Sequence, residues 1–182
     1  MKGDLCAVIS SVPLVNQFSH VTLETPIGKD ALPGHYVMLN KKPAYIMGQS
    51  ATTLELLLPE FSTKTVSVSA LQGTPLDKPS ENFNLLTFTN ETLSAGIFYL
   101  KKYRTLFKGL LFIGMDADFP FKPCPSRKLI PGIPPDVIAA LPLFEDWGIA
   151  HRLASLKEQP GVFHGTAKDL AKLWLAHNYF RR

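Results

Sequence analysis

The turn Thr89-Asn90-Glu91-Thr92 is the segment whose position in the chain best suits chemistry. It joins the apolar run Leu85–Phe88 to residues 91–104, where apolar side chains recur at helical spacing. A helix N-terminus that follows a strand presents free amides and a partial positive charge, which favours a phosphate. Close approach of a phosphate also requires glycine, and the first one here is Gly96. The turn therefore predicts a helix start capped by Asn90 that anchors the sheet of the second half of the chain.

The histidines do not follow a metal-binding or catalytic pattern. None of the five occurs in HxxxH or HExxH spacing, so no metal site and no catalytic residue is predicted. His35 lies in an expected strand and is interpreted as structural. His151 is expected on a helix near Glu145 and Asp146, where surface charge pairing is commoner than acid–base catalysis. GxSxG, Walker and GxGxxG sequences are also absent.

The two cysteines, Cys6 and Cys124, are too few for a tetracysteine zinc site or an iron–sulfur cluster within the chain. Because the N-terminus does not resemble a secretion signal, we expect two free thiols and a cytoplasmic protein. Cys124 lies between two prolines, with lysine and arginine nearby. Such cations would lower the thiol pKa, although a structural cysteine is the favoured interpretation.

Charge and hydropathy narrow the classes of partner. The net charge is +4, and residues 91–182 carry 13 basic and 8 acidic groups. These charges are scattered and lack interleaved aromatic residues, so no nucleic-acid partner is expected. The sequence contains no apolar run of the roughly 20 residues that a membrane helix needs, so no transmembrane segment is expected.

The spacing of apolar residues predicts two kinds of structure in succession. Residues 1–76 hold short alternating segments, typical of a small antiparallel β-barrel, at Ala7–Val12, Val21–Glu24, Tyr36–Asn40, Ala44–Met47, Leu54–Leu58 and Val66–Ala70. Residues 77–83 are a polar linker, and residues 84–182 form a small parallel-sheet α/β domain. That domain is expected to contain Leu85–Phe88, helix 91–104, strand Leu110–Met115, the extended proline-rich segment Phe119–Pro135, strand Val137–Leu143, helix Phe144–Leu156 and helix Ala167–His177.

This order of domains, together with several short motifs, resembles the ferredoxin–NADP reductase superfamily. Pro33-Gly34-His35-Tyr36-Val37 is similar to a barrel strand of the family, and Lys42-Pro43 stands where its flavin motif begins with Arg-Pro. Leu71–Leu76 is similar to the region that closes the barrel. Leu85–Ile97 corresponds to the glycine-rich nicotinamide loop. The relatives closest in pattern are the electron-transfer subunits of dihydroorotate dehydrogenase.

Several positions depart from the family pattern. Lys42 keeps a positive charge but lacks the planar fork of arginine, and Tyr45 replaces a small hydroxyl residue. Thr89, Asn90 and Thr92 replace glycines, and the cysteine cluster that binds [2Fe–2S] is absent. If a flavin or nucleotide is still bound, the resemblance assigns its contacts to Lys42, Pro43, Tyr45, Asn90 and Thr92.

These departures favour a non-catalytic accessory subunit without a cofactor, bound to protein partners in a larger assembly. The alternative is a flavoprotein or electron-transfer subunit that binds FAD or FMN. For the accessory function, Phe119, Phe121, Ile130 and Ile133 on the proline-rich segment are candidate partner contacts. A preordered loop loses little conformational freedom on docking. The same phenylalanines could instead fold back onto the sheet.

Overall fold

The computed structural model describes residues 4–179, and their packing forms two compact units. The first comprises the residues up to Lys78 together with Glu91–Tyr103. The second comprises Pro79–Asn90 and the residues from Arg104 onward. Residues 77–83 contain no helix or strand. The boundaries expected from the sequence, at 76 and 84, stay a prediction.

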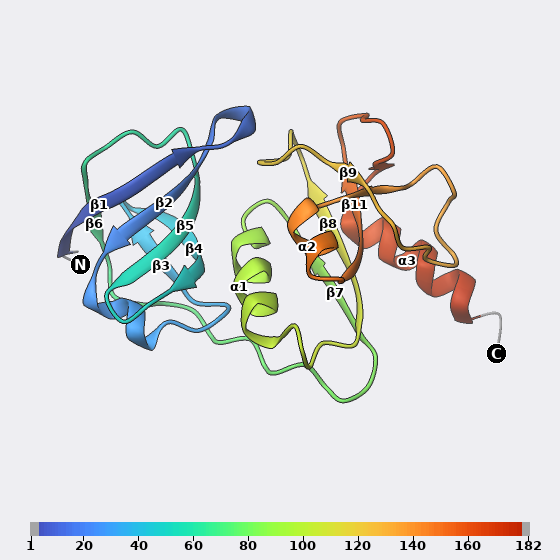
Figure 1. Cartoon of the computed structure of the whole chain (residues 1–182), viewed down its shortest axis with the longest axis horizontal. Helices are drawn as coiled ribbons and strands as arrows, with labels where there is room; N and C mark the ends of the chain where they lie inside the picture. The colour runs from blue at the N-terminus through green and yellow to red at the C-terminus, as the bar shows by residue number, and fades with distance from the viewer. Residues whose placement is uncertain (1–3, 180–182) are drawn as a thin grey trace. The chain divides into compact units, whose positions relative to one another are not determined.

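The first unit is built on a closed barrel of six antiparallel strands, in the order β1-β2-β5-β4-β3-β6 (Figure 1). The strands are β1 (Asp4–Pro13), β2 (Phe18–Glu24), β3 (Tyr36–Leu39), β4 (Lys42–Gln49), β5 (Thr53–Pro59) and β6 (Thr65–Val68). Short 3₁₀ segments, η1 (Val15–Gln17) and η2 (Pro26–Asp30), lie in the loops around β2. Each predicted strand segment is present, and the predicted barrel is confirmed. Every second side chain along β2 and β5 is buried, and these side chains fill the barrel interior.

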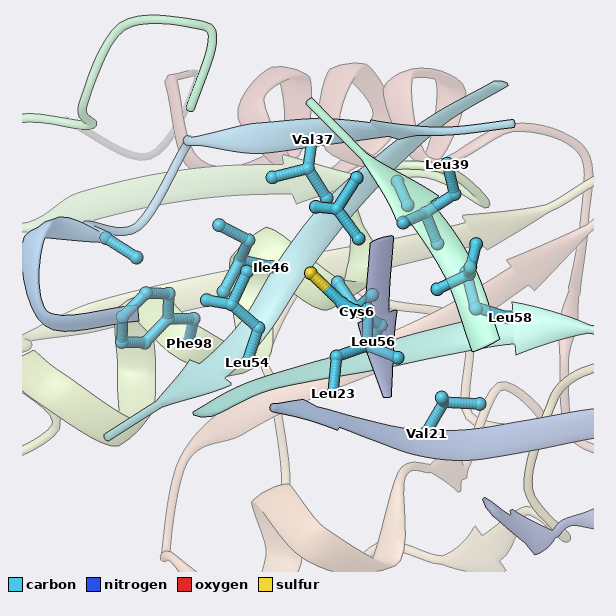
Figure 2. Close-up of a cluster of buried hydrophobic side chains, with 14 residues drawn as sticks. Cys6, Val21, Leu23, Val37, Leu39, Ile46, Leu54, Leu56, Leu58 and Phe98 are labelled. Atoms are coloured by element: carbon cyan, nitrogen blue, oxygen red, sulfur yellow. The ribbon is translucent and has the colours of Figure 1, made fainter. Parts of the chain in front are cut away.

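A large side chain from outside the strands also enters the barrel core (Figure 2). Phe98, on helix α1 (Leu93–Tyr103), is buried with barrel residues such as Ile46 and Leu54. The helix packs along β4. We expected α1 to anchor the sheet of the second half, but the helix belongs to the barrel unit. Most of its side chains are buried, as is typical of a helix with apolar residues around most of its circumference.

The second unit contains a four-stranded parallel sheet in the order β12-β11-β8-β7. Its strands are β7 (Asn84–Phe88), β8 (Gly109–Met115), β11 (Ala150–Ser155) and β12 (Phe163–His164). Helix α3 (Ala167–Tyr179) packs on this sheet through Ala167, Leu170 and Ala171. The predicted parallel sheet is confirmed, because residues 84–115 run strand, helix, strand with β7 and β8 paired in parallel.

Two predicted elements in the second unit are wrong. Val137–Leu143 is not a strand of the main sheet: only β10 (Ala139–Ala140) is extended, and it pairs with β9 (Cys124–Pro125) in a separate two-stranded sheet. Phe144–Leu156 is not a helix, because α2 (Pro142–Asp146) is short and β11 follows it. Pro142 fixes a helical φ at the start of α2. Gly148, at φ 70°, turns the chain into β11.

No helix within residues 4–179 is both long enough and apolar enough to cross a bilayer. The segment Phe119–Pro135 contains no helix, as predicted, but it is not extended throughout: apart from the two residues of β9 it is irregular and contains bends and a turn.

Candidate functional site

The outer face of the β3–β4 hairpin carries an aromatic pair. Val37 and Ala44 are paired across the hairpin and buried in the barrel, so their neighbours Tyr36 and Tyr45, which also pair, point outward. The two tyrosine rings lie 5.4 Å apart between centroids, at 52°. Both side chains are half-buried. The face therefore offers aromatic surface that solvent can reach.

The same face extends toward the hairpin turn. Met38 pairs with Pro43 on the outer side, one pair closer to the turn than the tyrosines. At the turn, Asn40 and Lys41 have φ of 47° and 71°, as in a type I′ hairpin. Lys41 and Lys42 are exposed there. The predicted residues Lys42, Pro43 and Tyr45 thus lie on one hairpin. The two tyrosines, Met38 and Pro43 form its apolar outer surface, and the cations Lys41 and Lys42 lie beside that surface.

Asn90 does not have the role that we predicted for it. Its side-chain Nδ2 donates to Asp116 Oδ2 at 2.9 Å, and its Oδ1 accepts the Asp116 backbone N–H at 3.0 Å. Asp116 directly follows β8, so this pair ties together the carboxyl ends of β7 and β8. The amide is engaged there and not as a cap of α1. Thr92 lies in the barrel unit, where its carbonyl accepts the Gly96 N–H at the start of α1.

A hollow of about 160 Å³ lies at the carboxyl edge of the parallel sheet. Its lining comes from the strand ends and the start of α3: Thr89, Gly114, Met115, Asp116, Leu156, Gly165, Thr166, Ala167 and Lys168. This edge is where open α/β sheets bind ligands. Gly114 allows α3 to approach the sheet, because a Cβ there would lie 2.9 Å from the Ala167 nitrogen.

The start of α3 is already occupied by a carboxylate of the chain. Thr166 donates from its backbone N–H and from Oγ1 to Asp169 Oδ2, and the Asp169 N–H donates back to Thr166 Oγ1. These hydrogen bonds lower the pKa of Asp169. The arrangement is a capping box, which confirms Thr166 as the predicted cap. A second anion at this terminus would face a fixed negative charge.

A buried polar network in the second unit was missed by sequence reasoning. Arg152 is 3% exposed and donates from Nε to the Val137 carbonyl, from Nη1 to the His151 carbonyl and from Nη2 to the Lys128 carbonyl. It therefore holds both ends of the loop 128–137 against β11. The residue type gave no signal, since arginine is rarely fully buried.

Glu145 holds the same loop nearer its start. Its carboxylate accepts Ser126 Oγ at 2.6 Å and the Arg127 N–H at 3.0 Å. Burial by itself would raise the pKa of Glu145, but these hydrogen bonds, with His151 and Arg127 nearby, lower it. The predicted surface pairing of His151 with Glu145 and Asp146 is wrong, because Glu145 and His151 are both buried.

Two histidines are structural. His151 lies on β11, fully buried, and accepts the Leu141 N–H at Nε2 while Nδ1 lies 2.9 Å from the Ile149 carbonyl. Burial lowers its pKa and keeps the ring neutral. His35 Nδ1 accepts the Leu32 N–H at 3.2 Å, and burial lowers its pKa too. The structural interpretation of His35 is confirmed.

The thiols and the predicted partner contacts are less available than the sequence suggested. Cys6 and Cys124 are both free, as expected. Burial, followed by the charge of Glu145, raises the pKa of Cys124 and so disfavours a reactive thiolate. Phe119 is 1% exposed and packs against Phe121, so it folds back onto the unit.

The rest of the proline-rich loop presents a different side chain to solvent. Ile130 and Ile133 are partly buried against the core beneath α3. The neighbouring Leu129 is 96% exposed. Partner binding by Phe119, Phe121, Ile130 and Ile133 stays a prediction.

The sequence matches no protein-family model and no curated protein. Its fold, however, matches solved structures. The NADH-dependent reduced ferredoxin–NADP oxidoreductase aligns with 94% of this chain and 63% of its own, at a TM-score of 0.63 and 10% identity. The flavohem-like FAD/NAD-binding domain of nitric oxide dioxygenase from Vibrio cholerae aligns with 90% of this chain and 78% of its own, at a TM-score of 0.61 and 9% identity. Ferredoxin–NADP⁺ reductase from Plasmodium falciparum aligns with 97% of this chain and 77% of its own, at a TM-score of 0.55 and 13% identity.

The chain therefore has the fold of the ferredoxin–NADP reductase superfamily: a closed antiparallel barrel and a parallel α/β sheet, in a shortened form. The predicted resemblance is confirmed at the level of the fold. The chain spans less than two thirds of the length of the first of these structures. The closer likeness to electron-transfer subunits of dihydroorotate dehydrogenase stays a prediction.

Proposed function

We propose that this protein is a flavin-binding electron-transfer protein that exchanges electrons with a partner protein. The observation that carries the proposal is the outward-facing Tyr36–Tyr45 pair beside Lys41 and Lys42 on the β3–β4 hairpin. The proposal adopts what the sequence offered as the alternative. It is supported by the similar folds, which include an oxidoreductase described for flavin-based electron bifurcation and an FAD/NAD-binding domain.

The residues of the hairpin fit a flavin in FMN or FAD form. An isoalloxazine ring is flat and largely apolar, and exposed aromatic rings stack favourably with such surfaces. Pro43 and Met38 continue the apolar surface beyond the tyrosines. Lys41 and Lys42 supply cations for a phosphate, as point charges and not as a bidentate fork. A bound flavin would supply the redox chemistry, and the chain would bind and orient it.

The residues at the β7–α1 turn do not fit a nicotinamide dinucleotide. Thr89 and Asn90 carry Cβ atoms where close backbone approach needs glycine. The Asn90 amide is engaged by Asp116, and the Asp116 carboxylate places a negative charge at the same edge. The start of α3 is complemented by Asp169. We therefore assign the supply of electrons to a partner protein.

A non-catalytic accessory role is the second candidate. It is favoured by the Asn90–Asp116 pair, which closes the turn between β7 and α1 with the chain's own groups. On this alternative the chain keeps the reductase fold as a scaffold for a larger assembly. The two candidates differ in one property, namely whether the β3–β4 face binds flavin.

The test is a titration of FMN, FAD and riboflavin with the full chain, followed by quenching of flavin fluorescence and by thermal unfolding. A ligand at 100 times its Kd should stabilise the fold by about 2.7 kcal/mol. Tyr45→Ala should weaken all three ligands about 2- to 10-fold through lost stacking, whereas Tyr45→Phe should not. Tyr103→Ala, on α1, is the matched control.

Lys42→Ala distinguishes the contribution of the flavin phosphate to binding from that of the flavin ring. It should weaken FMN and FAD but leave riboflavin unchanged, because riboflavin lacks a phosphate. NADH and NADPH should give no thermal shift. If none of the three flavins is quenched or shifts the melting temperature, the flavin proposal is wrong and the accessory role is supported.

A further inference from the structure

The hollow at the carboxyl edge of the parallel sheet takes no part in the proposed flavin function. All of its lining residues belong to the second unit, and its volume is about 160 Å³. An apolar cavity of about 150 Å³ is large enough to hold benzene. Met115 and Ala167 are buried in its wall, and Leu156, which also lines it, is 52% exposed. The hollow therefore has room and apolar contacts for one compact hydrocarbon group.

A carboxylate in a fixed position lines the hollow at the end of β8. Asn90 Nδ2 donates to Asp116 Oδ2 at 2.9 Å, and the Asp116 backbone N–H donates to Asn90 Oδ1 at 3.0 Å. The second carboxylate oxygen of Asp116, Oδ1, has no hydrogen-bond partner among residues 4–179. Two hydrogen bonds thus orient this side chain, and Oδ1 is available to a cationic donor, which forms strong hydrogen bonds with carboxylates.

A cation lines the hollow on another wall, in the first turn of α3. Lys168 is exposed there. The charged groups next to the lining residues in the sequence are already paired: Lys157 with Asp118 at 2.7 Å, and Lys172 with Asp169 at 3.8 Å. In the described part of the chain no ion pair includes Asp116 or Lys168. The hollow therefore carries one carboxylate and one ammonium without an opposite charge.

These walls together define the chemistry of a suitable ligand. A nucleotide phosphate brings negative charge alone, which would match the ammonium but face the carboxylate. An amine alone would leave Lys168 without an opposite charge, and a carboxylic acid alone would do the same to Asp116. A zwitterion with a compact apolar body matches both charges and the apolar wall. A free α-amino acid with a branched aliphatic side chain has all three groups.

We propose that this hollow binds a free α-amino acid of the size of leucine. Its ammonium donates to Asp116 Oδ1, and its carboxylate accepts from Lys168 Nζ. Its side chain packs on Met115 and Leu156. The amides at the start of α3 are not the partners of the carboxylate, because Asp169 already complements that helix terminus. The proposal is independent of flavin binding, since the β3–β4 hairpin contributes no lining residue.

The first test compares leucine with two analogues that each lack one of its charges. The full chain is titrated with L-leucine, with 3-methylbutylamine, which lacks the carboxylate, and with 4-methylpentanoate, which lacks the ammonium. Backbone amide signals in NMR spectra report binding, and those of Gly165 and Ala167 should move with leucine. Each analogue should bind about tenfold or more weakly than leucine, because it loses one hydrogen bond between charged groups.

The second test assigns each charge of the ligand to its residue. Asp116→Asn and Lys168→Met should each weaken leucine binding by about tenfold or more. Asp116→Asn should not weaken 4-methylpentanoate, and Lys168→Met should not weaken 3-methylbutylamine, because each analogue lacks the group that the substituted residue binds. The matched controls are Asp136→Asn and Lys172→Met, at exposed residues outside the lining, and they should leave the Kd for leucine unchanged.

Three results would overturn the proposal. One is the absence of any shift of the lining amides at about 10 mM leucine, which is ten times a Kd of 1 mM. Another is an analogue that binds as tightly as leucine, which would mean a site for a simple cation or a simple anion. The third is leucine binding that Asp116→Asn and Lys168→Met leave unchanged while both variants keep the melting temperature of the unmodified chain.

Discussion

Arg152 provides the sharpest test of the buried network in the second unit. The substitution Arg152→Met removes three hydrogen bonds to the carbonyls of Val137, His151 and Lys128. It keeps a long apolar stem. Hydrogen bonds from a charged donor contribute about 1.5–3 kcal/mol each. Part of this is recovered, because burial of the guanidinium is itself costly. We expect the free energy of unfolding to fall by about 3 kcal/mol.

The measurement is urea unfolding followed by tryptophan fluorescence. The chain has two tryptophans, Trp147 and Trp174, and both lie in the second unit, so the signal reports that unit alone. The control is Arg127→Met. Its side chain is 78% exposed and its ion pairs to Glu145 and Asp146 measure 3.9 and 4.0 Å, so the expected change is below about 0.5 kcal/mol.

The loop itself supplies an independent readout for the same variant. If Arg152 holds the loop 128–137 at both ends, Arg152→Met should make that loop more sensitive to protease under native conditions, and Arg127→Met should not. A loss of less than about 1 kcal/mol in Arg152→Met, with an unchanged digestion pattern, would refute the reasoning.

Three further predictions concern other parts of the fold. The pKa of His151 is lowered by burial, so the unfolded chain binds more protons; stability is complete above about pH 6.5 and falls below it, by up to about 1.4 kcal/mol per pH unit. A urea unfolding midpoint that stays constant as the pH is lowered from about 7 to about 5.5 would contradict this. Phe98→Ala should cost about 3–5 kcal/mol in the barrel unit, measured by far-ultraviolet circular dichroism. Gly114→Ala should lower the free energy of unfolding of the second unit by about 1–3 kcal/mol, because the added Cβ would press on Ala167. Tryptophan fluorescence measures this change, and no change would mean that α3 can shift.

The two polar residues of β11 show where sequence patterns failed. His151 and Arg152 interrupt an otherwise apolar segment, so the sequence pattern predicted a charged helix in place of the strand. Both side chains are buried because backbone groups elsewhere in the unit bond to them: the Leu141 N–H for the histidine, and distant carbonyls for the arginine. Partners ten or more residues away leave no local pattern, and they decide whether a polar residue can be buried.

The β3–β4 hairpin shows the opposite case. Its alternation of inward Val37 and Ala44 with outward Tyr36 and Tyr45 could be predicted from a period of two residues. Lys42, Pro43 and Tyr45, three of the residues that carry the family resemblance, therefore lie on one hairpin. Asn90 was harder to place, because an amide in a turn can cap a helix or bond to a neighbouring strand, and only the position of Asp116 selects between these roles.

The sequence by itself determined the six strands of the barrel, the strand–helix–strand unit from Leu85 to Met115 and the fold that they imply. These features depend on local periodicity and turn residues, which are properties of short segments. The tertiary structure alone decided that Phe98 completes the barrel core, that β11 is a strand and that Arg152 holds the proline-rich loop. Each of these depends on contacts between residues far apart in the chain, and their free energy exceeds local preference.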